Sequence, residues 1–228
     1  MNNKNNSIYL EKPKYLYTIL MRGDNGAGKT QVLNRYVDGD FGDTSGYVDF
    51  KVKNLIINEE YIKLRIWDLS IGCESFRRSQ AYFRNIHGIV FIYDIINIES
   101  FTSIKQHWYE HYKKFRLDNK DVPSSKSSLN PGYGLKNNIP QILVIGTKSD
   151  LRNKDNYKKC VDTDQAREFA NSINALFYET SSKDNINVNS SFLDLTTQLI
   201  NCTETIEVSN NNDQKTQQKK PFSICSIN

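Results

Sequence analysis

The chain of 228 residues lacks any apolar run near the roughly 20 residues that a membrane-spanning helix needs. It also lacks a signal peptide at its start and any Cys-x-x-Cys pair, and its four cysteines stand far apart, at positions 73, 160, 202 and 225. We therefore expect a protein of the reducing cytosol, whose link to a membrane would be a lipid anchor or a partner protein.

Strong charge of one sign is missing as well, because the formal net charge is only +4. Domains that bind nucleic acid usually carry a strongly basic face, so we expect no nucleic acid partner. The material for a core is present, since 38% of the residues are hydrophobic and 11% aromatic. The length fits one domain with additional segments.

Short apolar runs alternate with helical patterns over most of the chain. Buried strands are expected at 15–21, 87–93, 140–146 and 175–179, and helices at 30–37, 99–115, 164–174 and 187–202. Residues 48–53 and 61–67 alternate between apolar and polar side chains, with Asn58-Glu59-Glu60 between them, which predicts a hairpin. The pattern predicts an α/β fold with a mostly parallel sheet, covered by helices on both faces, and one antiparallel edge hairpin.

Composition divides the chain into a domain and three segments outside its core. Residues 1–13 are rich in asparagine and residues 203–228 are mostly polar, so we expect a disordered start and a flexible tail around a domain at 14–202. Within that domain, residues 117–138 are rich in Ser, Asn, Gly and Pro and predict a surface insertion.

The strongest motif is the run Gly23-Asp24-Asn25-Gly26-Ala27-Gly28-Lys29-Thr30, which has the spacing of a phosphate-binding loop. Glycines let the backbone wrap closely and turn its N–H groups inward, and the helix that follows directs its positive end at the phosphates. Lys29 would reach the β- and γ-phosphates, and the Thr30 hydroxyl would ligate Mg²⁺. A glycine turn with a chance lysine is the alternative, but the loop follows an expected strand and precedes an expected helix. The motif therefore predicts a nucleoside triphosphate without naming the base.

The base is indicated by Lys148 and Asp150, which follow the expected strand at 140–146. A carboxylate there can accept two hydrogen bonds from guanine N1 and N2, which adenine cannot supply. Lys148 would lie flat against the base. Ser181, Ser182 and Lys183 follow the last expected strand, where a backbone N–H group can meet guanine O6.

Beyond these motifs, the chain resembles the Ras superfamily and, within it, the Rab branch. The resemblance covers about residues 15–200 without the insertion and rests on the segments 48–51, 63–68, 81–84, 91–95 and 179–183. It implies a mostly parallel six-stranded sheet between helices and a site for GTP or GDP with Mg²⁺. It further implies a switch in vesicle and membrane traffic, with effectors, an exchange factor and an activating protein, on the cytoplasmic face of a membrane and exchanging with the cytosol.

The resemblance also implies roles for single residues. Phe41 would pack on the guanine, and Asp68 would support Mg²⁺ through water. Ser45 would take the place of a threonine that binds Mg²⁺ and the γ-phosphate, with Thr44 as its rival, in a loop about three residues shorter than the family form. The effector surface would comprise Val48, Asp49, Phe50, Trp67 and Tyr82, whose aromatic members have ordinary core packing as the alternative.

The segment Asp68-Leu69-Ser70-Ile71-Gly72-Cys73 departs from the family's Asp-Thr-Ala-Gly-Gln. With a one-residue insertion, Gly72 is the glycine that meets the γ-phosphate and Cys73 replaces the catalytic glutamine; without a gap, Gly72 replaces the glutamine. Both alignments lose the residue that orients the attacking water, so we expect slow GTP hydrolysis, or a hydrolysis-deficient scaffold as the alternative. Thr147 replaces the asparagine of the guanine site, as in the related Rho branch.

Two further motifs have a functional and a plainer interpretation, and one further function is an alternative. Cys225-Ser226-Ile227-Asn228 resembles a Cys-a-a-X prenylation motif, with an unmodified tail as the alternative. His107 and His111 have a spacing that could hold zinc, but a packed helix is the favoured interpretation. A nucleoside kinase with a phosphate loop is a third hypothesis for function, against which Lys148, Asp150 and the 181–183 segment argue.

Overall fold

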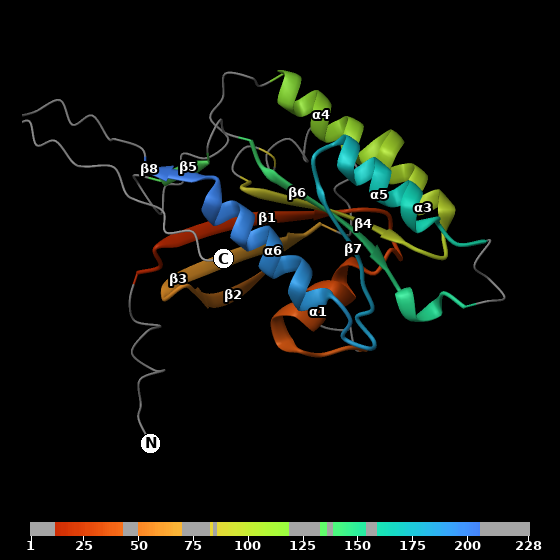
Figure 1. Ribbon diagram of the computed structural model, residues 1–228, viewed down its shortest axis with the longest axis horizontal. Coiled ribbons are helices and arrows are strands. Elements are labelled where there is room, and N and C mark those ends of the chain that lie inside the picture. Colours follow the sequence, from red (N-terminus) through yellow and green to blue (C-terminus); the bar gives the residue numbers. More distant parts are fainter. Residues whose placement is uncertain are drawn as a thin grey trace, which may run out of the picture.

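The computed structural model describes residues 12–42, 50–69, 83, 86–118, 133–135, 139–153 and 159–205. Within them, a six-stranded sheet of order β2-β3-β1-β4-β6-β7 lies between helices (Figure 1). Its strands are β1 (Tyr15–Arg22), β2 (Phe50–Ile57), β3 (Glu60–Asp68), β4 (Gly88–Asp94), β6 (Gln141–Thr147) and β7 (Leu176–Glu179). The β2–β3 pair is antiparallel and the other neighbours are parallel, which confirms the predicted fold class.

Each face of the sheet buries its own cluster of apolar side chains. Helices α1 (Lys29–Asp38) and α6 (Val188–Asn201) pack on one face, where Ile19 and Met21 of β1 lie. Leu20 of the same strand faces the other cluster, with α3 (Ile98–Ser103), the π-helical turn η2 (Ile104–Trp108), α4 (Tyr109–Asp118) and α5 (Thr163–Ser172). Burial on both faces explains why β1, β4 and β6 are continuous apolar runs.

The β2–β3 hairpin turns at Asn58 and Glu59, which have φ angles of 51° and 65°. Two successive residues of positive φ give a turn whose twist matches that of the strands it joins, and asparagine tolerates this conformation well. The hairpin was predicted. The predicted strand at 48–53 ended too early, however, because β2 (Phe50–Ile57) continues to Ile57.

The helix expected at 99–115 is three consecutive segments. Asn97 caps α3 through its side-chain oxygen, which accepts from the backbone N–H groups of Glu99 and Ser100. The turn η2 then interrupts the α-helical register before α4 begins at Tyr109. Turns of this kind redirect the side chains that follow and are frequent at functional sites.

A second, two-stranded sheet joins regions predicted to lie outside the core. Strand β5 (Tyr133–Leu135) pairs antiparallel with β8 (Thr203–Thr205). Leu135 is 4% exposed and belongs to the cluster under α1 and α6, while Thr203 shares a 2.8 Å hydrogen bond with the Tyr17 hydroxyl. The prediction of a wholly surface insertion was therefore wrong at Leu135, and the expected domain end at 202 precedes β8. Each strand has only three residues, which is too short for a periodic pattern to be recognised in the sequence. Residues 1–11 and 206–228, for which disorder and a flexible tail were predicted, lie outside the described residues.

No helix among the described residues is long and apolar enough to span a membrane.

Candidate nucleotide-binding site

The phosphate-binding loop connects β1 to α1 and requires glycine at two positions for steric reasons. A Cβ atom on Gly23 would lie 2.0 Å from the carbonyl oxygen of Ile92, on the adjacent strand β4. Gly28 has a φ angle of 87° at the start of α1, and a Cβ there would lie 3.2 Å from Oγ1 of Thr147. A side chain at Gly23 would therefore displace the loop from β4, and one at Gly28 would strain the backbone and crowd the Thr147 side chain.

Lys29 lies across the loop and is 3% exposed. Its Nζ donates to the carbonyl oxygens of Gly23 at 2.8 Å and Asp24 at 2.7 Å. Burial lowers the pKa of Lys29, while the nearby carboxylates of Asp68 and Asp24 oppose that change. A cavity of about 340 Å³ opens beside it, lined by Asn25, Gly26, Gly28, Lys29, Thr30, Gln31 and Lys148. The ammonium group and the first turn of α1 give this cavity the character of an anion site.

Two of the expected Mg²⁺ residues lie in contact. Thr30 Oγ1, in the first turn of α1, donates to Oδ2 of Asp68 at the end of β3, at 2.6 Å. Asp68 is fully buried, so its carboxylate is shielded from solvent. A hydroxyl and a carboxylate are hard oxygen donors of the kind that Mg²⁺ takes, and these two fit that ion. Ser45 and its rival Thr44 lie outside the described residues.

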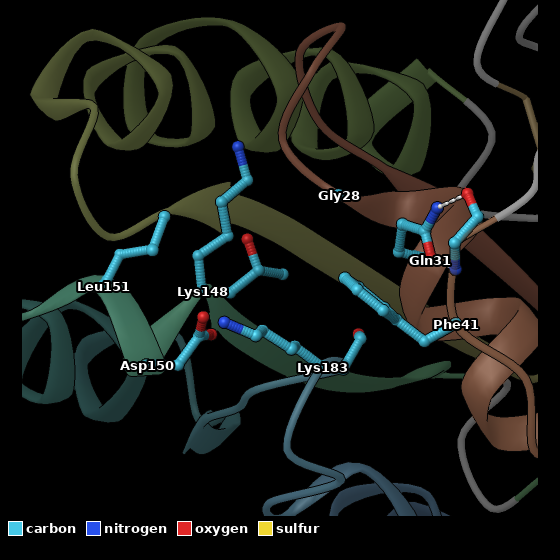
Figure 2. A pocket seen from close by; sticks show the side chains of 10 residues that line it. Gly28, Gln31, Phe41, Lys148, Asp150, Leu151 and Lys183 are labelled. Carbon is cyan, nitrogen blue, oxygen red and sulfur yellow. Dashed lines mark hydrogen bonds between the residues drawn. The ribbon is translucent and has the colours of Figure 1, made fainter.

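A second cavity, of about 310 Å³, lies where a guanine base was expected (Figure 2). Its lining residues are Gly28, Gln31, Phe41, Gly42, Thr147, Lys148, Asp150, Leu151, Ser182 and Lys183. Figure 2 shows the Phe41 ring on one side of the cavity, with Lys148 and Asp150 on the other. Asp150 is the second residue of the short turn η4 (Ser149–Leu151), and its Oδ1 accepts from Oγ of Ser181 at 2.7 Å. The serine thus fixes the carboxylate in its place at the cavity.

Lys148 and Thr147 tie the strand ends to the phosphate loop. Lys148 has a φ angle of 63°, and its Nζ donates to Oδ2 of Asp94 at 2.6 Å and to the carbonyl oxygen of Gly26 at 3.0 Å. The Thr147 hydroxyl lies 2.7 Å from the Ala27 carbonyl oxygen and 3.1 Å from that of Tyr93. Threonine in place of the family's asparagine therefore still offers a donor to the loop.

Two residues that the sequence analysis missed hold the rim of the second cavity. Arg35 of α1 donates to the carbonyl oxygens of Ser182 at 2.6 Å and Lys183 at 3.3 Å, and its guanidinium lies 5.9 Å from the centre of the Phe41 ring. Gln31 exchanges two hydrogen bonds with the backbone of Gly42, at 3.0 and 3.2 Å. The hydrogen bonds are made to backbone atoms of other segments. Because every residue has such atoms, no sequence motif predicts these contacts.

The loop that carries Asp150 is braced from behind by an ion pair. Arg152 contacts both carboxylate oxygens of Glu179, at 2.6 and 2.9 Å, and also donates to Oγ1 of Thr163 at 2.7 Å. Glu179 ends β7, immediately before the segment that contains Ser181. This pair connects the two segments that carry Asp150 and Ser181, which are expected to face guanine.

The remaining predicted residues fall into two groups. Phe50 and Trp67 lie side by side on the β2–β3 hairpin, both half-buried, with ring centres 4.7 Å apart. Val48, Asp49, Gly72, Cys73, Tyr82 and Cys225 lie outside the described residues.

The histidine pair consists of His107 in η2 and His111 in α4. The ring centres of His107 and His111 lie 4.1 Å apart, and burial together with His107, Arg22 and Lys114 lowers the pKa of His111. No group of three potential metal ligands occurs among the residues described. The neighbouring positive charges of Arg22 and Lys114 disfavour a cation beside His111.

Comparison with known proteins agrees with this geometry. A sequence model of the Ras family matches residues 18–201. The GTP-binding protein ypt1 of Schizosaccharomyces pombe is 34% identical over 191 residues, which cover 81% of this chain and 80% of that protein. The Ras-related protein Rab-1A of Dictyostelium discoideum is 33% identical over 192 residues, 82% of each chain. With the six-stranded sheet and the phosphate loop, these matches show that the chain belongs to the Ras family, as a Rab-like small GTPase.

Proposed function

We propose that this chain is a guanine-nucleotide switch of the Rab type, which binds GTP or GDP with Mg²⁺ and recruits effector proteins in membrane traffic when GTP is bound. The observation that carries the proposal is the convergence of three groups around two cavities that share Gly28, Gln31 and Lys148. These groups are the phosphate loop, the Thr30–Asp68 pair and the Asp150–Ser181 pair.

Each residue has a distinct part in this function. Lys29 and the first turn of α1 bind the β- and γ-phosphates, and Thr30 ligates Mg²⁺ with Asp68 behind it. Asp150 accepts from guanine N1 and N2, while Phe41 and Lys148 cover the two faces of the base. Phe41 is 47% exposed, so its ring is accessible for stacking on a planar ligand.

Competition between bases tests the central claim. Labelled GTP bound to the full chain in Mg²⁺ buffer is titrated with unlabelled GTP or ATP, and only GTP should displace it efficiently. Lys29→Ala should weaken binding because a charged contact to the phosphates is lost. Lys113→Ala is the matched control, since Lys113 is exposed and pairs with Glu110 on α4. Equal displacement by ATP would contradict the proposal.

Slow hydrolysis is the second part of the proposal and rests on the sequence of the 68–73 segment. Neither Cys73 nor Gly72 offers both a donor and an acceptor at the reach of a glutamine amide, so the attacking water is poorly held. The rate should fall by a factor of roughly 10 to 1,000 relative to a glutamine-bearing Rab protein. Single-turnover hydrolysis of bound GTP, with Cys73→Gln and Gly72→Gln alongside, tests this and identifies the correct alignment. A complete lack of turnover with nucleotide binding intact would favour the hydrolysis-deficient scaffold.

Attachment to a membrane through Cys225 completes the proposal. The motif Cys225-Ser226-Ile227-Asn228 fits prenylation, and Lys215, Lys219 and Lys220 upstream would add modest attraction to anionic lipid. The intact mass of the protein isolated from its own cells is the measurement. An unmodified Cys225 that retains the last three residues would refute this part alone.

A further inference from the structure

Trp108 makes a side-chain hydrogen bond to the phosphate loop and lines neither of the two cavities. Its indole Nε1–H donates to Oδ1 of Asp24, the second residue of the loop, at 2.7 Å. Trp108 is the last residue of the π-helical turn η2, in which the Tyr109 N–H group bonds to the carbonyl oxygen of Ile104. The π turn therefore ends at the residue whose side chain reaches the loop.

Asp24 connects this bond to the residue that is expected to hold phosphate. Its carbonyl oxygen accepts from Nζ of Lys29 at 2.7 Å and from the N–H group of Ala27 at 3.3 Å. A hydrogen bond to a charged carboxylate contributes more than one between neutral groups. The indole thus fixes the side chain of a residue whose backbone shapes the loop and orients the lysine.

A buried arginine holds the indole ring in place. Arg22, two residues before Asp24, is 1% exposed, and its guanidinium lies 5.5 Å from the ring centre of Trp108 and 5.6 Å from that of Phe83. Phe83 in turn contacts the ring of Phe115 on α4 at 5.2 Å. A planar guanidinium packs well between aromatic faces, so Trp108 is restrained both by its ring and by its N–H group.

We propose that Trp108 and Arg22 are positioning residues that hold Asp24 and thereby set the lifetime of bound nucleotide. Neither is among the described residues that line the two cavities, so they act through the shape of the loop and not by contact with the ligand. The inference rests on the proposed binding of guanine nucleotides and adds a determinant of release that lies outside the lining of the two cavities. Anything that displaces the Trp108 indole should speed release of the nucleotide.

The experiment measures release of fluorescent GDP from the full chain with excess unlabelled GDP. Trp108→Phe and Asp24→Ala should each speed release by roughly tenfold, as expected for loss of one hydrogen bond to a charged group. The double variant should release no faster than either single variant, because all three lack the same bond. Asp24→Asn keeps an oxygen acceptor and should stay within roughly threefold of the parent. Tyr109→Phe removes a hydroxyl from the next residue of the helix and should change nothing.

Guanine-over-adenine preference is measured in the same variants and should remain unchanged, since the base cavity is untouched. Circular dichroism checks folding; if Trp108→Phe does not fold, the contrast between Asp24→Ala and Asp24→Asn carries the test. A parent that binds no guanine nucleotide refutes the proposed function together with this inference. A parent that binds normally while the single variants release at the parent rate overturns the inference alone. Multiplying effects in the double variant, or loss of base preference, also overturn it, because either would show independent or merely structural roles.

Discussion

Thr147→Val removes the hydroxyl that stands where the family has an asparagine amide. Thr147 is 2% exposed, and its one hydroxyl hydrogen serves either the Ala27 carbonyl oxygen at 2.7 Å or that of Tyr93 at 3.1 Å. Valine has nearly the same shape but leaves the Ala27 carbonyl without this donor. An unsatisfied buried acceptor costs about 1–3 kcal/mol. Since Ala27 belongs to the phosphate loop, we expect GDP binding to weaken by about tenfold, which corresponds to about 1.4 kcal/mol.

Displacement of fluorescent GDP in Mg²⁺ buffer gives the affinities, and Thr147→Ser is the matched control. Serine keeps the donor and loses only the methyl group, whose carbon would lie 3.6 Å from a Cβ built on Gly28. The serine variant should therefore bind within about threefold of the parent. Valine binding as tightly as threonine would refute the role of the hydroxyl, and serine binding as weakly as valine would assign the effect to the methyl group.

Three further predictions concern stability, measured by urea unfolding. Burial lowers the pKa of His87 from 6.5 to about 4, so the unfolded chain binds the proton first and stability should fall by about 3 kcal/mol between pH 6.5 and pH 4. This loss should be absent in His87→Asn, whose amide oxygen can accept from the Thr18 N–H group as Nδ1 does at 3.0 Å; an unchanged pH dependence would contradict it. Arg152→Met should cost about 1–3 kcal/mol by leaving the Glu179 carboxylate without its bidentate partner, and adding Glu179→Gln should recover part of that, whereas additive losses would argue against the pair. Leu135→Ala should cost about 2–4 kcal/mol, and a loss below about 1 kcal/mol would mean that β5 contributes little to the core.

The parts of the fold that were predicted are those in which chemistry and pattern are local. The strand β1, the loop after it and the helix α1 follow from one apolar run, the glycine spacing and a helical pattern. The hairpin likewise follows from alternation on either side of Asn58 and Glu59. In each case the residues that determine the structure are neighbours in the sequence, so a local pattern is enough to predict the element.

What was missed depends on contacts between distant residues. A charged residue at the end of a strand is ordinarily exposed, and nothing in the sequence near Arg22 shows that two aromatic rings from other segments will enclose it. The π turn at Ile104–Trp108 changes the helical register without changing composition. Arg35 and Gln31 donate to backbone oxygens. Every residue has such an oxygen, so the sequence does not show which residue will be the partner.

The pairing of β5 with β8 also implies an order in which parts of the fold form during synthesis of the chain. Translation at about 5–20 residues per second separates the synthesis of Leu135 from that of its partner Thr203 by roughly 3–14 s. During that interval the strands β1 to β4 and β6 can already associate, but β5 lacks its partner β8, and Leu135 and Tyr17 lack their contacts with Thr203. The strand β8 therefore completes this part of the core late, through a contact of long sequence separation. A nascent chain that stops short of Thr203 exposes an unpaired edge and apolar surface of the kind that chaperones recognise.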